Sequence, residues 1–110
     1  MTIEQEIEIF NDYAKSLTEI FARKRNDYGQ TTTETFEKFG PISMLVRMHD
    51  KLGRLDNLLG FGKYPQYESA EDTLIDLANY CLITLIEIRK QEEELGCAKI
   101  NNNFEGYIKK

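Results

Sequence analysis

Three segments of the chain place apolar residues at the spacing of an α-helix. In residues 2–27 the steps between apolar positions alternate between three and four, which is the helical period. These positions are Ile3, Ile7, Phe10, Ala14, Leu17 and Phe21. Thr2 and Gln5 have the spacing of a capping box, so we expect the first helix to begin there.

The second predicted helix spans residues 41–59, and the third spans about residues 69–94. Pro41 suits the first helical position, where a missing N–H does no harm, and the Ser69 hydroxyl is expected to cap the N–H of Asp72. The positions expected to be buried in the second helix are Ile42, Leu45, Val46, Leu52, Leu55 and Leu59. Between the first two helices, QTTTETFEKFG has β-branched threonines and no sustained period, which predicts a loop, and GFGKYPQY ends the second helix.

These elements predict an all-α fold, a small antiparallel bundle of three main helices. At 110 residues the chain is expected to be a single domain covering residues 1–110, with a loosely ordered tail at 96–110. Apolar residues nearly encircle the third helix, and two neighbouring helices of one chain can hardly cover such a surface. We therefore predict that a homo-oligomer, a dimer or larger, completes the bundle.

The charge of the chain limits its partners. The net charge of −5 and a pI near 4.9 argue against binding to a DNA or RNA polymer, because surfaces that coat nucleic acids are basic. No apolar run reaches about 18 residues, and the acidic start MTIEQEIEIF differs from the basic start of a signal peptide. The sequence predicts a soluble, cytoplasmic protein without a membrane partner.

Charged residues follow one face of each of the last two predicted helices. On the third helix a stripe about 80° wide contains polar groups only, at 100° per residue. Its members are Glu68, Asp72, Asp76 and Asn79. The second helix carries the opposite charge on one face, with Asp50 at the edge of that face. The cations are Arg47, Lys51 and Arg54.

Two interpretations of these opposed stripes remain open. In the first, Lys51 and Arg54 pair with Asp72 and Asp76, and the charges are structural. In the second, the three cations of the second helix hold the phosphates of a nucleotide, and the carboxylates and Asn79 orient them or contact ribose and base.

The second interpretation adds residues near the end of the first helix and allows a metal ion. Lys24 and Arg25 would join the phosphate site, and the ring of Tyr28 would stack on a base. Binding itself requires no cofactor. Mg²⁺ prefers oxygen ligands and often shares them with substrate phosphates. The candidate ligands for Mg²⁺ are Asp50, Glu68, Asp72 and Asp76.

The segments ARKRNDYG, RMHDKLGRLDNLL and ESAEDTLIDLANY resemble the nucleotide-modification-associated domain family of phages and bacteria. That family has a DYG turn, a helix with the pattern DKLxRL and a helix with the pattern ES..DTLxDLANYA. The similarity spans most of residues 20–88. It implies a phage or bacterial protein that handles nucleotides, in the host cytoplasm if a phage encodes it.

A more distant similarity is to the MazG-like all-α nucleoside triphosphate pyrophosphatases. Asp72 and Asn79 match the aspartate and asparagine of their second metal-binding helix. The chain departs from the first metal-binding helix, because Lys51 and Arg54 stand where those enzymes carry two glutamates. Ser69 stands at the upstream glutamate of the second helix, with Glu68 shifted by one place.

Three functions follow as hypotheses. The first is a small protein that binds a phosphorylated nucleotide and sequesters it, including a host signalling nucleotide, without turnover. The second is a Mg²⁺-dependent nucleoside triphosphate pyrophosphohydrolase of MazG-like type, since such hydrolysis needs metal ions and a base that activates water. The third is a non-catalytic accessory subunit of a nucleotide-modifying complex.

Overall fold

The computed structural model describes residues 1–94, which form four α-helices and no β-strand. The helices are α1 (Ile3–Tyr28), α2 (Thr31–Phe39), α3 (Ile42–Leu59) and α4 (Tyr67–Glu94). The prediction of an all-α fold is confirmed for this part of the chain, whereas the count of three helices is wrong. The predicted tail at residues 96–110 lies outside the described residues.

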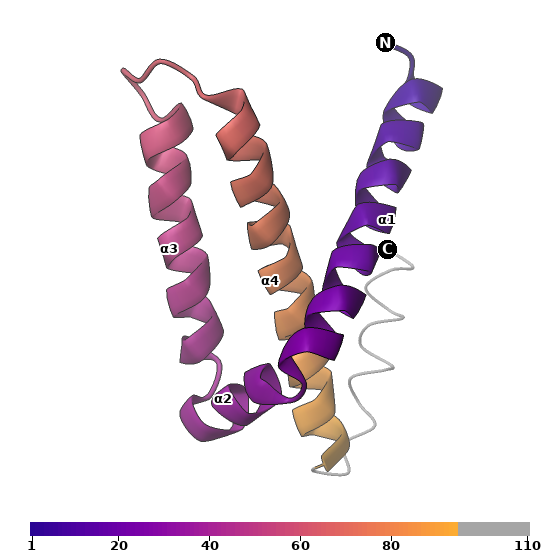
Figure 1. Ribbon diagram of the computed structural model, residues 1–110, viewed down its shortest axis with the longest axis vertical. Helices are drawn as coiled ribbons and strands as arrows, with labels where there is room; N and C mark the ends of the chain where they lie inside the picture. The colour runs from indigo at the N-terminus through magenta and orange to yellow at the C-terminus, as the bar shows by residue number, and fades with distance from the viewer. Residues whose placement is uncertain (95–110) are drawn as a thin grey trace.

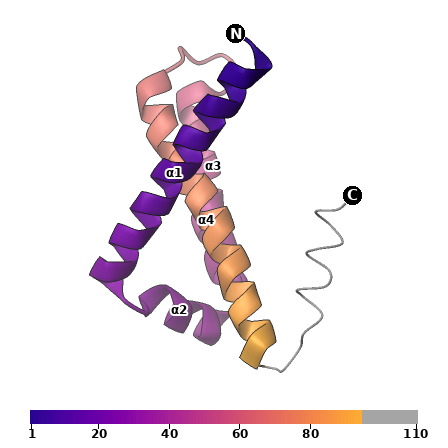
Figure 2. The same cartoon turned by 90° about the vertical axis from the view of Figure 1, so that its right-hand side faces the viewer.

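Helices α3 and α4 form an antiparallel pair, and α1 and α4 run in the same direction (Figure 1). Seen from the side, α1 crosses α4 at an angle (Figure 2), and in the first view the two helices separate toward the start of α1 (Figure 1). Helix α2 lies across one end of the molecule and carries the chain from α1 to α3 (Figure 1). This end brings the last turns of α1, all of α2 and the later turns of α4 near one another.

The predicted helix starts are confirmed for α1 and need correction for α3 and α4. The Thr2 hydroxyl accepts the N–H of Gln5 (3.1 Å), and the Gln5 side chain accepts the N–H of Thr2 (2.8 Å), which completes the capping box. Pro41 precedes the first residue of α3 instead of occupying that position. Ser69 does not begin α4, because the helix already starts at Tyr67, and the Ser69 carbonyl accepts the hydroxyl of Thr73 (3.1 Å).

Helix α2 stands where the sequence predicts a loop. Its threonines have a modest helix propensity because of their branched side chains. The burial of the Phe36 ring outweighs this preference, and the Thr35 hydroxyl finds its partner within the helix by donating to the Thr31 carbonyl (2.9 Å). The helix ends at Gly40, whose φ of 76° favours glycine. Tertiary burial therefore decides the structure of this segment.

The apolar core of residues 1–94 is small. Its buried apolar residues are Phe36, Met44 and Ala70. Most of the α3 positions that were expected to be buried are exposed, and they include Ile42, Leu45, Val46, Leu52 and Leu59. The expectation of burial within one chain is wrong for these residues, because α3 has only α4 and α2 as close neighbours (Figure 1). No helix described for residues 1–94 has the length and apolar character needed to cross a membrane.

A hydrogen bond from Tyr13 to Glu71 joins the first half of α1 to the start of α4, with 2.6 Å between the phenol oxygen and Glu71 Oε1. The pKa of Tyr13 is raised above its ordinary value of 10.0, because the hydrogen bond favours the protonated phenol and the nearby negative charge disfavours the phenolate. A pKa raised by folding stabilises the folded state below the unfolded value, near pH 10. This contribution is lost as the pH rises through the higher folded pKa.

We expect the substitution Glu71→Gln to lower the pKa of Tyr13, because it removes the negative charge beside the phenol. An NMR pH titration of tyrosine-labelled protein measures this pKa directly. Glu34→Gln on α2 is the matched control and should leave it unchanged. Equal Tyr13 titration curves for wild type and Glu71→Gln would contradict the assigned cause.

Candidate functional site

A cleft of about 360 Å³ lies between the end of α1, the start of α2 and the facing sides of α3 and α4. Its volume is in the range of small-molecule sites, about 300 to 1,000 Å³. Four cations from three helices line it: Lys24, Arg25, Arg47 and Lys90. The remaining polar and aromatic groups that matter for binding are Asp76, Asn79, Glu87, Phe21 and Tyr80. The cleft thus combines positive charge, hydrogen-bonding groups and two rings.

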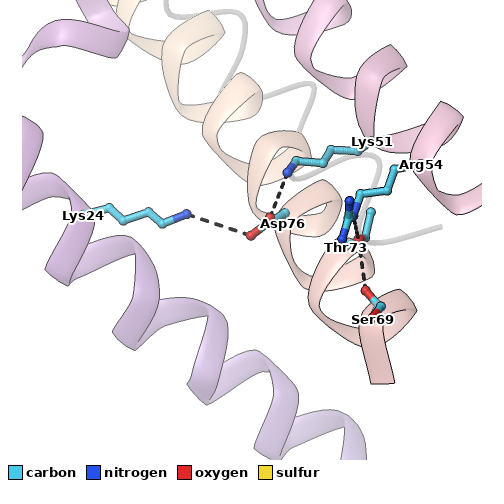
Figure 3. A network of polar contacts seen from close by, with 6 residues as sticks. All are labelled: Lys24, Lys51, Arg54, Ser69, Thr73 and Asp76. Atoms are coloured by element: carbon cyan, nitrogen blue, oxygen red, sulfur yellow. Dashed lines mark hydrogen bonds and ion pairs between the residues drawn. The ribbon is translucent and has the colours of Figure 1, made fainter. Parts of the chain in front are cut away.

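Asp76 on α4 connects a lysine of α1 with a lysine of α3. Lys51 on α3 donates to Asp76 Oδ2 (2.9 Å), and Lys24 on α1 lies 3.9 Å from Asp76 Oδ1 (Figure 3). About a third of the Asp76 side chain is exposed to solvent, so such pairs contribute little stability, about 0 to 1 kcal/mol each. Their clearer effect is to hold Lys24 and Lys51 at the edge of the cleft.

Arg54 belongs to a separate contact, one turn farther along α3. Its Nε donates to the Thr73 hydroxyl (3.1 Å), which in turn donates to the Ser69 carbonyl (Figure 3). Thr73 is buried, so its hydroxyl needs these partners. Arg54 does not line the cleft, and it is better described as a contact between α3 and α4.

A second polar group occupies the other end of the cleft. The Glu87 Oε1 atom on α4 accepts from the Thr33 hydroxyl (2.9 Å) and from Lys90 Nζ (3.2 Å). Lys90 also donates to Thr33 Oγ1 (3.0 Å), so the three side chains form a closed triangle that ties α2 to α4. Glu87 is only 3% exposed, which is unusual for a carboxylate.

Two buried polar atoms of the cleft residues have no hydrogen-bond partner among residues 1–94. They are Nδ2 of Asn79 and Oε2 of Glu87, and Gln91 Nε2, one turn after Glu87 on α4, is a third such atom. Buried polar groups in native proteins are almost always hydrogen-bonded, and each exception needs an explanation. One donor and one acceptor beside a cationic cleft are therefore available to a ligand.

The structure brings together five of the nine residues that the sequence predicts for a nucleotide site. Lys24, Arg25, Arg47, Asp76 and Asn79 line the cleft. Lys51 reaches it through Asp76. Arg54 and Asp72 are outside the lining, and Asp72 is exposed. The side chain of Tyr28 is outside the described part of the structure, so its stacking role stays a prediction.

The candidate metal ligands are not gathered into one centre. Asp50, Glu68 and Asp72 are exposed, and Asp76 pairs with the two lysines. Within residues 1–94 no group of three or more histidine, cysteine, aspartate or glutamate side chains is arranged to hold a metal ion. The Mg²⁺ site stays a prediction without a matching cluster in this part of the chain.

Sequence reasoning did not include Thr33, Glu87 and Lys90 in the site. A signal for Glu87 was present, because Asp76 and Glu87 are eleven residues apart and so lie on nearly the same line of a helix. The polar stripe predicted on the third helix ends at Asn79 and so does not include Glu87. Thr33 could not be placed by pattern, because its segment was expected to be a loop.

The fold of residues 1–94 and the cleft together define a small, all-helical unit with a cationic site between its helices. Comparisons with protein-family models, with curated proteins and with solved structures found no match for the chain.

Proposed function

We propose that the chain is a small nucleotide-binding protein of a phage or bacterium, and that it holds a phosphorylated nucleotide in the cleft between α1, α2, α3 and α4. One observation carries the proposal: four cations line the cleft together with Asn79 and Glu87, each of which has a buried polar atom without a hydrogen-bond partner among residues 1–94. Lysine and arginine bind phosphate oxygens through charge-assisted hydrogen bonds. Phe21 and Tyr80 supply aromatic surface for a base.

Binding without turnover is favoured over hydrolysis by the position of Lys51. In the resemblance to MazG-like pyrophosphatases, this residue replaces a metal-binding glutamate. Its ammonium group lies 2.9 Å from Asp76 Oδ2, where its charge opposes a divalent cation at the same carboxylate. A protein of this kind would sequester its nucleotide, including a signalling nucleotide of the host cell, and would act in the cytoplasm.

The proposal is tested with a panel of nucleoside mono-, di- and triphosphates, cyclic dinucleotides and ADP-ribose, each with and without Mg²⁺. We expect at least one member to raise the melting temperature, because a ligand that binds only the folded state stabilises it. Chromatography of the same mixtures should recover that member unchanged. Release of pyrophosphate with Mg²⁺ would favour the pyrophosphohydrolase. Neither binding nor turnover across the panel would favour the accessory subunit.

The proposed fold is MazG-like and is completed by a second copy of the chain. The support is the large exposed apolar surface, since Ile3, Ile7 and Phe10 form one exposed stripe on α1 and Leu45 and Val46 are exposed on α3. The three residues on α1 follow one face of the helix, and contiguous exposed apolar surface is typical of interaction sites. Light scattering should give a molar mass at least twice that of one chain, with a melting temperature that rises with concentration. A single-chain mass at all concentrations would contradict this proposal.

A further inference from the structure

The buried carboxylate of Glu87 is held so that one oxygen is engaged and the other is available. Thr33 and Lys90 both donate to Oε1, at 2.9 Å and 3.2 Å. The other oxygen, Oε2, is buried and has no partner among residues 1–94. A carboxylate can only accept hydrogen bonds. The group that completes Oε2 is therefore a hydrogen-bond donor.

We infer that Glu87 accepts a hydrogen bond from one ribose hydroxyl of the bound nucleotide, 2′ or 3′, and makes the cleft select nucleotides that carry this hydroxyl. This inference rests on the proposed nucleotide site. Because only one oxygen is uncommitted, Glu87 suits a single donor such as a hydroxyl. The paired N–H donors of a guanine edge would need both oxygens and would displace Thr33 and Lys90.

The position of Glu87 along α4 fits this role. Asp76, which lies 3.9 Å from Lys24, and Glu87 are eleven residues apart, a distance of about 16 Å along a helix. The phosphates belong at the end of the cleft near Lys24, where two ammonium groups, Lys24 and Lys51, surround the single carboxylate of Asp76. The sugar then lies toward Glu87, with Ile83 and Ile86 lining the wall beside it.

Thr33 and Lys90 act as positioning residues for Glu87. Their three mutual hydrogen bonds fix the carboxylate against α2 and orient Oε2. Asn79 offers the complementary donor, Nδ2, on the same helix and in the same cleft. A ligand with both an acceptor and a hydroxyl donor satisfies both buried groups at once, and a ribonucleotide has both.

The test measures the Kd of ATP, CTP, GTP and UTP and of their 2′-deoxy and 3′-deoxy counterparts by calorimetry. For wild type, we expect one of the two deoxy series to bind about 10-fold more weakly than the ribonucleotide, the factor for one lost hydrogen bond to a charged group. In Glu87→Gln the ratio of the deoxynucleotide Kd to the ribonucleotide Kd should fall by about fivefold, because a neutral amide forms a weaker hydrogen bond than a carboxylate. Glu93→Gln, an exposed position on the same helix, is the matched control and should keep the wild-type difference.

The wild-type comparison does not depend on any variant folding. Equal affinities for ribo- and deoxynucleotides would overturn the role of Glu87 and leave the nucleotide site intact. An undiminished preference in a folded Glu87→Gln protein would also overturn it. If none of the four triphosphates binds, this inference fails, while the wider panel decides the proposed function separately.

Discussion

Phe36→Ala should lower the free energy of unfolding by about 3 to 5 kcal/mol, the usual loss when a buried phenylalanine is truncated. Phe36 is 4% exposed and is one of only three buried apolar residues in the part of the chain that the structure describes. The free energy of unfolding of a protein is about 5 to 15 kcal/mol in total, so the loss of this one ring would remove a large fraction of the stability. Urea denaturation followed by circular dichroism measures the change, and we expect α2 to lose its position as well.

Phe39 offers a matched control on the same helix. Its ring is 60% exposed and lies beneath the ammonium of Lys38, 5.3 Å from the ring centre. Phe39→Ala should therefore change the free energy of unfolding by about 0.5 kcal/mol or less, as exposed substitutions usually do. Similar losses in the free energy of unfolding for Phe36→Ala and Phe39→Ala would contradict the assignment of Phe36, and not Phe39, to the core.

The difference between these two rings also shows why α2 was not predicted. Periodic apolar residues identified α1, α3 and α4 to within about two residues, because each is long enough to repeat the helical period several times. Residues 31–39 contain only two phenylalanines and four threonines, which give no repeat. Their helix depends on the burial of Phe36, on packing against α3 and on the hydrogen bond from Thr33 to Glu87. These are tertiary interactions, and Glu87 is 54 residues away in sequence, so local reasoning could not supply them.

The candidate site was also predictable from the sequence only in part. The paired charges of α3 and α4 were visible as stripes, and Lys51 and Asp76 do meet across the two helices. Which cations line the cleft was not visible in the sequence, because that depends on where α1 crosses α4 and on where α2 lies. This arrangement places Arg47 in the lining and leaves Arg54 outside it, although both follow the same helical face.

If the cleft binds nucleotides as proposed, Arg47→Ala should weaken the binding of the panel member that binds most tightly by about 10- to 100-fold in Kd. The physical reason is the loss of charge-assisted hydrogen bonds to phosphate, about 1.5 to 3 kcal/mol. Arg47 is half-buried and is the α3 residue that lines the cleft. Calorimetric titration of wild type and variant gives both values of Kd.

Arg54→Ala is the control for charge, helix and residue type. Because Arg54 contacts Thr73 outside the cleft, its removal should leave Kd within about twofold and reduce stability slightly, since a hydrogen bond of this kind contributes about 0.5 to 1.5 kcal/mol. If a general electrostatic attraction held the nucleotide, both variants would lose affinity equally, because each loses one positive charge. A phosphate site in the cleft predicts weaker binding for Arg47→Ala and not for Arg54→Ala. An equal loss of affinity in both variants would therefore contradict nucleotide binding in the cleft.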